Sequence, residues 1–180
     1  LAPGSVYISS VDDQARAALY RLEVGCAAGT GKLRVAGGID SVMRESLQRA
    51  FAYIQGHKVP LGIAQAVDTT DFHVEAIDLL TNRVACDAGI GLVVAIYSAI
   101  KQQQTLAGLL ILGDLSIQGN IKKVRSLIEP LQVGMDNGAR RALIPIENKR
   151  DLLEVPGDIL ERIDSIFYGD PPGAALKALG

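Results

Sequence analysis

Apolar and polar residues follow two different spacings along this chain, and each spacing predicts an element. Near the start, β-favouring residues alternate with polar ones or form short continuous runs, which predicts a hairpin over 6–9 and 17–26. The segment 32–36 is a third predicted strand. After it, apolar residues recur at helical spacing between Asp40, a predicted N-cap, and Gly56, which ends the predicted helix.

The rest of the chain alternates between the two spacings. Residues 88–101 are apolar nearly all round, which is typical of a buried helix, and the short apolar run 108–112 is typical of a buried strand. The other predicted elements are extended segments over 72–80, 115–117, 141–144 and 163–168 and helices over 123–136, 147–153 and 171–179. Because strands come first as a run and later alternate with helices, we predict an α/β or α+β fold with a mixed sheet and packed helices.

Composition limits the classes of protein that fit. The chain has 180 residues, the length of one domain, and 18 Lys and Arg against 20 Asp and Glu give a formal net charge of −2. This balance argues against a protein that binds nucleic acid by charge alone. No apolar run reaches the roughly 18 residues that cross a bilayer, so we expect no membrane span. The two cysteines, Cys26 and Cys86, favour reduced thiols and a cytoplasmic location, with a disulfide between them as the less favoured alternative.

The run Ala28–Lys32 has the glycine content of a phosphate-binding loop. A P-loop needs a glycine five residues before its Gly-Lys pair and a hydroxyl residue directly after the lysine, and these positions hold Cys26 and Leu33. The segment also leads into a predicted strand, whereas a phosphate site of this kind needs a helix N-terminus. We therefore expect a hairpin turn here and no cofactor in this domain.

Several separated motifs resemble the proteolytic domain of Lon proteases. That family has D-x-H-x-H followed by P-K-D-G-P-S-A-G-I, and here D-F-H-V-E starts at Asp71 and D-A-G-I starts at Asp87. G-D-L-S-I-Q-G from Gly113 is similar to the family's G-E-I-T-L-R-G. I-P-I-E-N-K-R-D-L from Ile144 follows the family's I-P-x-E-N-K-R-D-L almost letter for letter. The motifs keep a fixed order over nearly the whole chain, so the resemblance implies a single Lon proteolytic-domain fold over 1–180.

The same register places other residues at the two positions that carry Lon catalysis. Asp87 stands where the family has its nucleophilic serine, and counting back from Ile144 places Ile128 where it has its lysine base. An aspartate carboxylate is a poor nucleophile toward peptides, and isoleucine has no proton chemistry. Lys122 and Lys123 lie about five to six residues earlier, which on a helix means roughly 7.5 Å of rise and another face, so neither is expected to replace the base. The resemblance thus implies a dyad-equivalent pair, Asp87 and Ile128, without peptidase activity.

The residues around Asp87 have simpler structural interpretations. Asp87 is expected to be the N-cap of the helix over 88–101, where aspartate and serine are both preferred. A role for Asp87 and Glu129 as paired carboxylates that activate water is the less favoured alternative. Cys86 is a candidate displaced nucleophile, although a small buried thiol is the commoner case. His73 occupies the position of the family's first histidine, and we expect a satisfied core histidine with a supporting role at most.

The C-terminal sequence indicates which group among the relatives of Lon proteases the chain resembles. F-Y-G-D-P from Phe167 and K-A-L from Lys177 match the signature F-Y-x-D-P-x-x-A-x-x-K-A-L, which is similar to the ending of the BrxL proteins of bacterial phage-defence (BREX) systems and their Lon-related cousins. This resemblance implies an upstream AAA+ module, the expected place for ATP, in a homo-oligomeric ring on DNA. Because the chain starts at Leu1 with no initiator methionine, we expect it to be a C-terminal domain cut from such a protein.

Three functions are compatible with these observations. The favoured hypothesis is a degenerate Lon-like domain that serves assembly and scaffolding for a BrxL-type ATPase in phage defence. The second is an active ATP-dependent endopeptidase with a rearranged site, for which Cys86 is the candidate nucleophile. The third is a DNA-binding Lon-like domain as in the recombination protein RadA, where a ring of copies would align Arg140, Arg141, Lys149 and Arg150.

Overall fold

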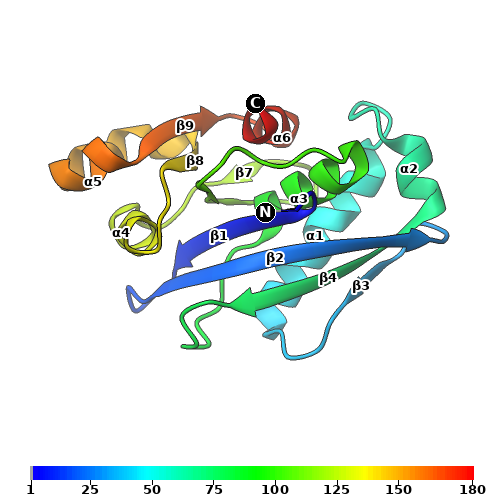
Figure 1. Ribbon diagram of the computed structural model, residues 1–180, viewed down its shortest axis with the longest axis horizontal. Helices are drawn as coiled ribbons and strands as arrows, with labels where there is room; N and C mark the ends of the chain where they lie inside the picture. Colours follow the sequence, from blue (N-terminus) through cyan, green and yellow to red (C-terminus); the bar gives the residue numbers. More distant parts are fainter. Residues whose placement is uncertain (1) are drawn as a thin grey trace.

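The predicted hairpin forms the middle of a seven-stranded mixed sheet (Figure 1). The computed structural model describes residues 2–180. The sheet has the strand order β3-β4-β2-β1-β5-β8-β9, in which β2 pairs antiparallel with β1 and β4 while the other pairs are parallel. A separate antiparallel ladder joins β6 to β7. The strands are β1 (Ser5–Val11), β2 (Ala17–Ala28), β3 (Leu33–Val35), β4 (Thr70–Asp78), β5 (Leu109–Ile111), β6 (Asp114–Leu115), β7 (Ile121–Lys122), β8 (Arg141–Pro145) and β9 (Asp164–Tyr168).

Helices cover both faces of this sheet, which confirms the mixed α/β class. They are α1 (Ser41–His57), α2 (Ala64–Thr69), α3 (Gly89–Lys101), α4 (Ile128–Asp136), α5 (Gly157–Arg162) and α6 (Pro171–Leu179), with a 3-10 segment, η1 (Ile146–Glu154). One hydrophobic cluster joins α1, α3 and α6 to the sheet, and a second joins α4 and α5 to its other side. Successive side chains of β1 point to opposite faces of the sheet, so Ile8 packs in the first cluster and Tyr7 packs against the second. Within residues 2–180, no helix combines the length and apolar character needed to cross a membrane.

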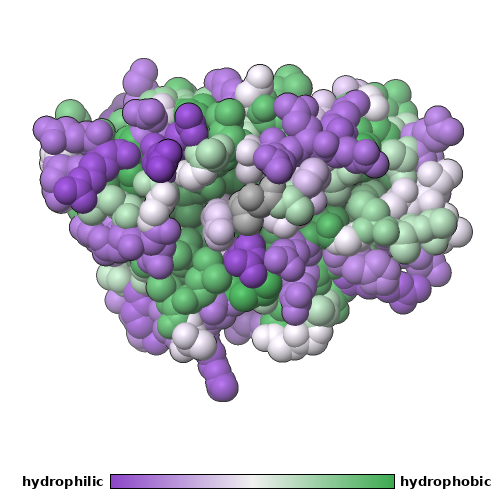
Figure 2. All heavy atoms as spheres, viewed as in Figure 1, coloured by the Kyte–Doolittle hydropathy of each residue, from purple (hydrophilic) through white to green (hydrophobic). Residues whose placement is uncertain are grey.

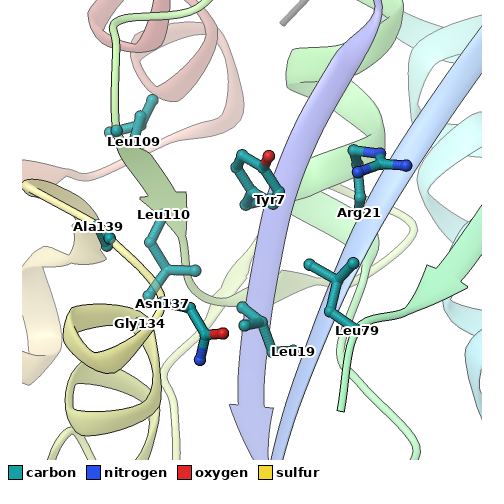
Figure 3. A pocket seen from close by; sticks show the side chains of 11 residues that line it. Tyr7, Leu19, Arg21, Leu79, Leu109, Leu110, Gly134, Asn137 and Ala139 are labelled. Atoms are coloured by element: carbon teal, nitrogen blue, oxygen red, sulfur yellow. The ribbon is translucent and has the colours of Figure 1, made fainter. Parts of the chain in front are cut away.

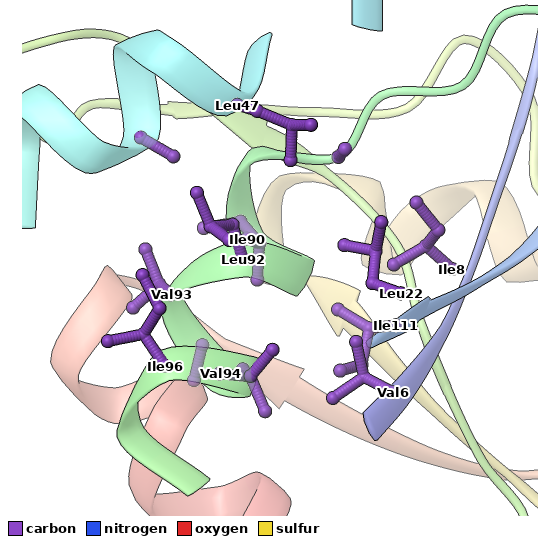
Figure 4. Packing of buried hydrophobic residues seen from close by; sticks show 14 of the residues in the cluster. Val6, Ile8, Leu22, Leu47, Ile90, Leu92, Val93, Val94, Ile96 and Ile111 are labelled. Atoms are coloured by element: carbon purple, nitrogen blue, oxygen red, sulfur yellow. The ribbon is translucent and has the colours of Figure 1, made fainter. Parts of the chain in front are cut away.

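Helix α3 is the centre of the larger cluster (Figure 4). Its apolar character all round is explained by its surroundings, since Leu92 and Ile96 have no exposed surface and are packed between the sheet and the neighbouring helices. A Cβ on Gly91 would lie only 2.3 Å from Cγ2 of Ile8, so glycine lets this helix lie directly on β1. Because α3 is buried between the sheet and the neighbouring helices, the loop that precedes it is held in a fixed position.

The chain before α4 is the main departure from the sequence prediction. A helix was expected over 123–136, but α4 begins only at Ile128. The preceding residues pair in β7, and the backbone of Val124 exchanges two hydrogen bonds of 2.9 Å with the buried amide side chain of Asn148. These bonds hold the segment extended and replace the hydrogen bonds that a helix would have made. The short helices α2 and α5 were also absent from the prediction, because six residues carry too little periodicity to be detected.

The glycine-rich segment is not a hairpin turn, so that prediction was wrong. Strands β2 and β3 do not pair with each other, because both lie beside β4 and the loop between them crosses its end. The Asp71 carboxylate accepts hydrogen bonds of 3.0 Å from the backbone N–H groups of Thr30 and Lys32, which lower the pKa of Asp71. A Cβ on Gly29 would lie 2.2 Å from Cγ of the same carboxylate. The N–H groups of this loop therefore bind a carboxylate of the chain itself, and the loop does not fit a nucleotide phosphate.

Candidate functional site

Two hydroxyl groups from other elements hold the segment that leads into α3. The hydroxyl of Ser10, on β1, accepts a hydrogen bond of 3.1 Å from the backbone N–H of Asp87. The hydroxyl of Ser46, on α1, accepts one of 3.1 Å from the backbone N–H of Ala88. Both serines are buried, so the position of Asp87 is fixed relative to the sheet and to α1.

Asp114, on β6, supplies the negative charge at the start of α3. Its carboxylate is buried and accepts hydrogen bonds from the Ser46 hydroxyl (3.1 Å), from Nη2 of Arg49 (2.9 Å) and from a backbone N–H of β6 (2.8 Å). A Cβ on Gly89 would lie 2.0 Å from Oδ1 of Asp114, so glycine is what lets the carboxylate approach the first turn of the helix. The aligned peptide dipoles of α3 favour a carboxylate at this end.

Asp87 does not cap α3, so the prediction of that role was wrong. Ala88 is the N-cap residue, and no side chain makes a capping hydrogen bond there. Among residues 2–180, no partner forms a hydrogen bond or an ion pair with the Asp87 carboxylate, which faces a cleft of about 730 Å³. Burial raises the pKa of Asp87, and the Asp114 carboxylate raises it further. The charges of Lys122 and Arg49 act in the opposite direction.

The cleft is lined mainly by charged residues and carries both signs of charge. Its cations include Lys122, Lys123 and Arg125, which come from β7 and the segment after it, while Asp12 and Asp13 come from the turn between β1 and β2. The full lining consists of Ser10, Val11, Asp12, Asp13, Val42, Arg49, Ala85, Cys86, Asp87, Asp114, Lys122, Lys123, Val124 and Arg125. The Asp87 side chain thus lies in an open cleft that apolar side chains do not fill.

The prediction that Lys122 and Lys123 share a helix with Ile128 was wrong. Lys122 lies in β7, opposite Asp114 in the ladder, and Lys123 follows it. Both line the cleft with Asp87, whereas Ile128 does not. Ile128 is the first residue of α4 and packs half-buried against the second hydrophobic cluster. The structure therefore brings Asp87 together with Lys122 and Lys123 and separates it from Ile128.

Cys86 is next to Asp87 in the cleft lining but is held as a thiol. The residue is 1% exposed, and its Sγ lies 3.5 Å from the carbonyl oxygen of Asp87. Burial raises the pKa of Cys86 far above the usual range, and the thiolate is the nucleophilic form. Cys26, on β2, is exposed, and both cysteines are free thiols. Cys86 therefore has the surroundings of a structural residue.

His73 lies on a different surface, and the prediction of a core histidine was wrong. Its side chain is exposed, while the flanking residues Phe72 and Val74 are buried, as the alternation of a strand requires. In the sheet, His73 is paired with Gly25 of β2 and Arg34 of β3. These three residues line a separate hollow along β2, β3 and β4, and none of them lines the Asp87 cleft.

The four basic residues considered for DNA binding lie at two ends of β8. Arg140 and Arg141 are at its start, where Arg141 donates a hydrogen bond of 2.5 Å to a loop carbonyl. Lys149 and Arg150 follow its end in η1, where Nζ of Lys149 lies 5.6 Å from the centre of the Phe167 ring. A strand of this length spans roughly 17 Å. One copy of the chain does not gather these four residues into a single patch.

Comparison with known proteins relates this chain to Lon proteases and to Lon-like proteases. The Lon protease (S16) C-terminal proteolytic domain family matches residues 14–170. A "Lon-like protease BrxL" of Escherichia coli O9:H4 (strain HS) is 27% identical over 99% of this chain and 26% of its own length. A second "Lon-like protease BrxL", from Bacillus cereus (strain H3081.97), is 26% identical over the same shares. A "Lon protease" of Escherichia coli (strain K12) is 31% identical over 81% of this chain and 19% of its own length. The chain spans about a quarter of the length of the BrxL relatives.

Proposed function

This chain belongs to the Lon protease (S16) C-terminal proteolytic domain family, and from that premise we propose that it is a degenerate member that does not hydrolyse peptides. It acts as the Lon-like domain of a longer, ATP-dependent, BrxL-type protein in phage defence, where it serves assembly and scaffolding. The upstream AAA+ module supplies ATP hydrolysis, and any contact with DNA belongs to the full assembly.

One observation supports the proposed lack of peptidase activity. The residue at the family's serine position is Asp87, and its backbone is fixed so that the carboxylate faces the cleft. A carboxylate has no hydroxyl proton for a base to remove, and an acyl-enzyme ester cannot form on it as it does on serine. The residue at the base position, Ile128, packs against the second cluster outside the cleft. The buried thiol of Cys86 does not supply a replacement nucleophile.

The proposed assembly role is supported by the extent of the relationship. The likeness to the BrxL proteins covers 99% of this chain but about a quarter of each relative. A domain that has lost its chemistry while keeping a well-packed framework is expected to act through its surfaces. Assembly with further copies of the parent protein is the surface function that we propose.

A peptidase assay tests the first half of this proposal. The purified chain is incubated with an unfolded protein substrate and with fluorogenic peptides, beside an active Lon protease as the positive control. We expect cleavage no faster than that of an Asp87→Ala variant. Robust cleavage that a single substitution in the cleft abolishes would overturn the proposal.

A rearranged peptidase is the second candidate, because Lys122 and Lys123 lie in the cleft beside Asp87. A lysine in such a cleft is a possible general base. This candidate predicts cleavage that is lost in Lys122→Met or Lys123→Met and kept in Asp13→Asn, which alters an exposed carboxylate in the same lining. Alkylation of the thiols would abolish the activity if Cys86 were the nucleophile.

A further inference from the structure

A groove between β3 and α1, which we name the β3–α1 groove, lies apart from the Asp87 cleft. Its volume is about 450 Å³, and it shares no lining residue with that cleft. Strand β3 forms one edge of the sheet, because it pairs with β4 on one side only (Figure 1). The floor of the groove is apolar, with Phe51 buried and with Leu33 and Val35 half-buried. Beyond the end of β3, a Cβ added at Gly37 or Gly38 would have no contact within 4 Å, so an extended chain can reach this edge.

The outward backbone groups of β3 have no hydrogen-bond partner within residues 2–180. In the parallel ladder, the N–H of Ala36 donates a hydrogen bond of 2.9 Å to the carbonyl of Val74, the residue opposite Val35. Because alternate residues of a strand turn their backbone groups to alternate sides, Leu33 and Val35 direct their N–H and C=O groups away from β4. These groups repeat at roughly 6.6 Å, the spacing of two residues in a strand. The edge therefore offers regularly spaced hydrogen bonds to a further strand.

The charged side chains that line this groove are cations. Lys32 and Arg34 come from β3 and the residue before it, and Arg44 comes from α1. None of the three forms an ion pair within residues 2–180. The carboxylate of Asp71 lies near Lys32 and Arg34, but it is outside the groove lining and accepts hydrogen bonds from N–H groups of the loop before β3. The groove therefore presents unpaired positive charge, which attracts an anionic ligand.

Two other hollows differ from this groove in charge. The Asp87 cleft carries both signs. The pocket beside α4 has a volume of about 370 Å³, and among the described residues that line it Arg21 alone is charged (Figure 3). Nε of Arg21 already donates a hydrogen bond of 2.9 Å to Glu23. Apolar side chains gather between α4 and the β1–β2 strands (Figure 2), so that surface does not present the unpaired charge of the β3–α1 groove.

We propose that the β3–α1 groove binds an extended acidic segment of a partner protein, which pairs with the outer edge of β3 as a further strand of the sheet. The backbone of the segment bonds to the N–H and C=O groups of Leu33 and Val35, and its carboxylates face the three cations. Cations on an edge strand discourage pairing with neutral or basic segments, so the side chains that protect this edge also select an acidic partner. A nucleic acid would match the charge but has no regular series of backbone N–H and C=O groups. This inference goes beyond the assembly of copies proposed above and is independent of the peptidase question.

Fluorescence anisotropy with a labelled peptide of alternating glutamate and valine residues tests this contact on the purified chain. We expect saturable binding that weakens as the salt concentration rises, because salt screens exposed charges. The matched control is the same peptide N-methylated at each residue, which keeps the charge but loses the N–H donors and should bind at least about fivefold more weakly. Equal binding of the N-methylated peptide, or binding of an oligothymidylate without binding of the peptide, would overturn the proposal.

Variants of the groove test the charge and the edge separately. Arg44→Glu should weaken peptide binding at least about fivefold, whereas Arg150→Glu, the same charge reversal at an exposed residue of η1, should change it less than about twofold. Val35→Pro removes an outward N–H and no hydrogen bond to β4, so it should weaken binding, while Val35→Ala should bind as the parent chain does. Circular dichroism checks that each variant is folded. Parental affinity in both folded Arg44→Glu and folded Val35→Pro would refute the contact.

Amide hydrogen exchange in the parent chain locates the bound peptide without any substitution. The N–H groups of Leu33 and Val35 should exchange rapidly in the free chain and slow down when the glutamate–valine peptide is bound. Bound peptide without added protection at these two residues would place it elsewhere and refute the proposal. The peptidase assay and the association of copies would be unaffected by that result, so failure of this inference and failure of the proposed function are distinguishable.

Discussion

The buried carboxylate of Asp114 is the group on which the geometry of the cleft depends most directly. Replacement by asparagine keeps the shape but removes the charge. The amide nitrogen would then face either Nη2 of Arg49 or the donors on the other carboxylate oxygen, and would leave a donor opposite a donor. We therefore expect Asp114→Asn to destabilise the fold and to loosen the start of α3.

The size of the loss follows from the burial of the pair. Removal of one partner of a buried ion pair costs about 3–5 kcal/mol. The side chain of Arg49 is 29% exposed while that of Asp114 is 5% exposed, so water partly replaces the lost partner of Arg49. The expected loss is thus at the lower end, about 3 kcal/mol in the free energy of unfolding. At about 2–4 °C per kcal/mol for a domain of this size, Tm falls by about 6–12 °C.

Urea unfolding followed by far-UV circular dichroism measures this loss at pH 7. Asp13→Asn is the control, because Asp13 is an exposed carboxylate in the same cleft, and its effect should stay within about 0.5 kcal/mol. A double-mutant cycle with Arg49→Met should give a coupling energy of at least about 1 kcal/mol. If Asp114→Asn costs no more than Asp13→Asn, the reasoning that this carboxylate holds the start of α3 is refuted.

Three further predictions follow from burial in the core and around the cleft. Leu92 has no exposed surface, so Leu92→Ala should lower the free energy of unfolding by about 3 kcal/mol, as measured by urea unfolding. Leu176 is 61% exposed, so the control Leu176→Ala should change that free energy by less than about 0.5 kcal/mol. At pH 8 a chromogenic disulfide reagent should titrate one thiol per native chain, that of Cys26, and reach Cys86 only after unfolding; rapid reaction of both would contradict the raised pKa of Cys86. Because burial raises the folded-state pKa of Asp87 above its unfolded value, the folded state loses stability as pH rises through that pKa, so Asp87→Asn should be more stable than the parent chain at pH 7. That advantage should shrink as pH falls through the folded-state pKa and be lost below about 4, the unfolded value, and a constant difference across pH would argue against it.

Local signals in the sequence were enough to predict most of the elements. The apolar character of 88–101 predicted the buried helix α3, and Asp40 and Asp170 were recognised as N-caps, with side chains that accept hydrogen bonds from Val42 and Gly173. These predictions succeeded because period, cap and turn residues act over a few positions of the chain. The family relationship was likewise readable, because its motifs are contiguous runs of letters.

The candidate site was only partly predictable, because its charges converge from distant segments. Asp87 was identified by register, but its partners were not. Asp87 was expected to place its carboxylate at the start of α3, but the carboxylate found there belongs to Asp114 of β6. Lys122 lies on β7 and Lys123 directly after it, and not on a helix with Ile128. The cause is the side chain of Asn148, 24 residues away from Val124, which takes the backbone bonds that would have continued α4 toward its N-terminus.

The sequence by itself therefore determined the family and the sheet-and-helix class, and it supplied the prediction that Asp87 stands at the family's serine position. Tertiary structure decided which charges surround the Asp87 carboxylate, which thiol is exposed and which apolar residue projects into solvent. The physical reason is the distance along the chain over which each effect acts. Periodicity and capping are set by neighbours a few residues apart, whereas a pKa, a cleft or an exposed leucine depends on what the rest of the chain places within a few ångströms.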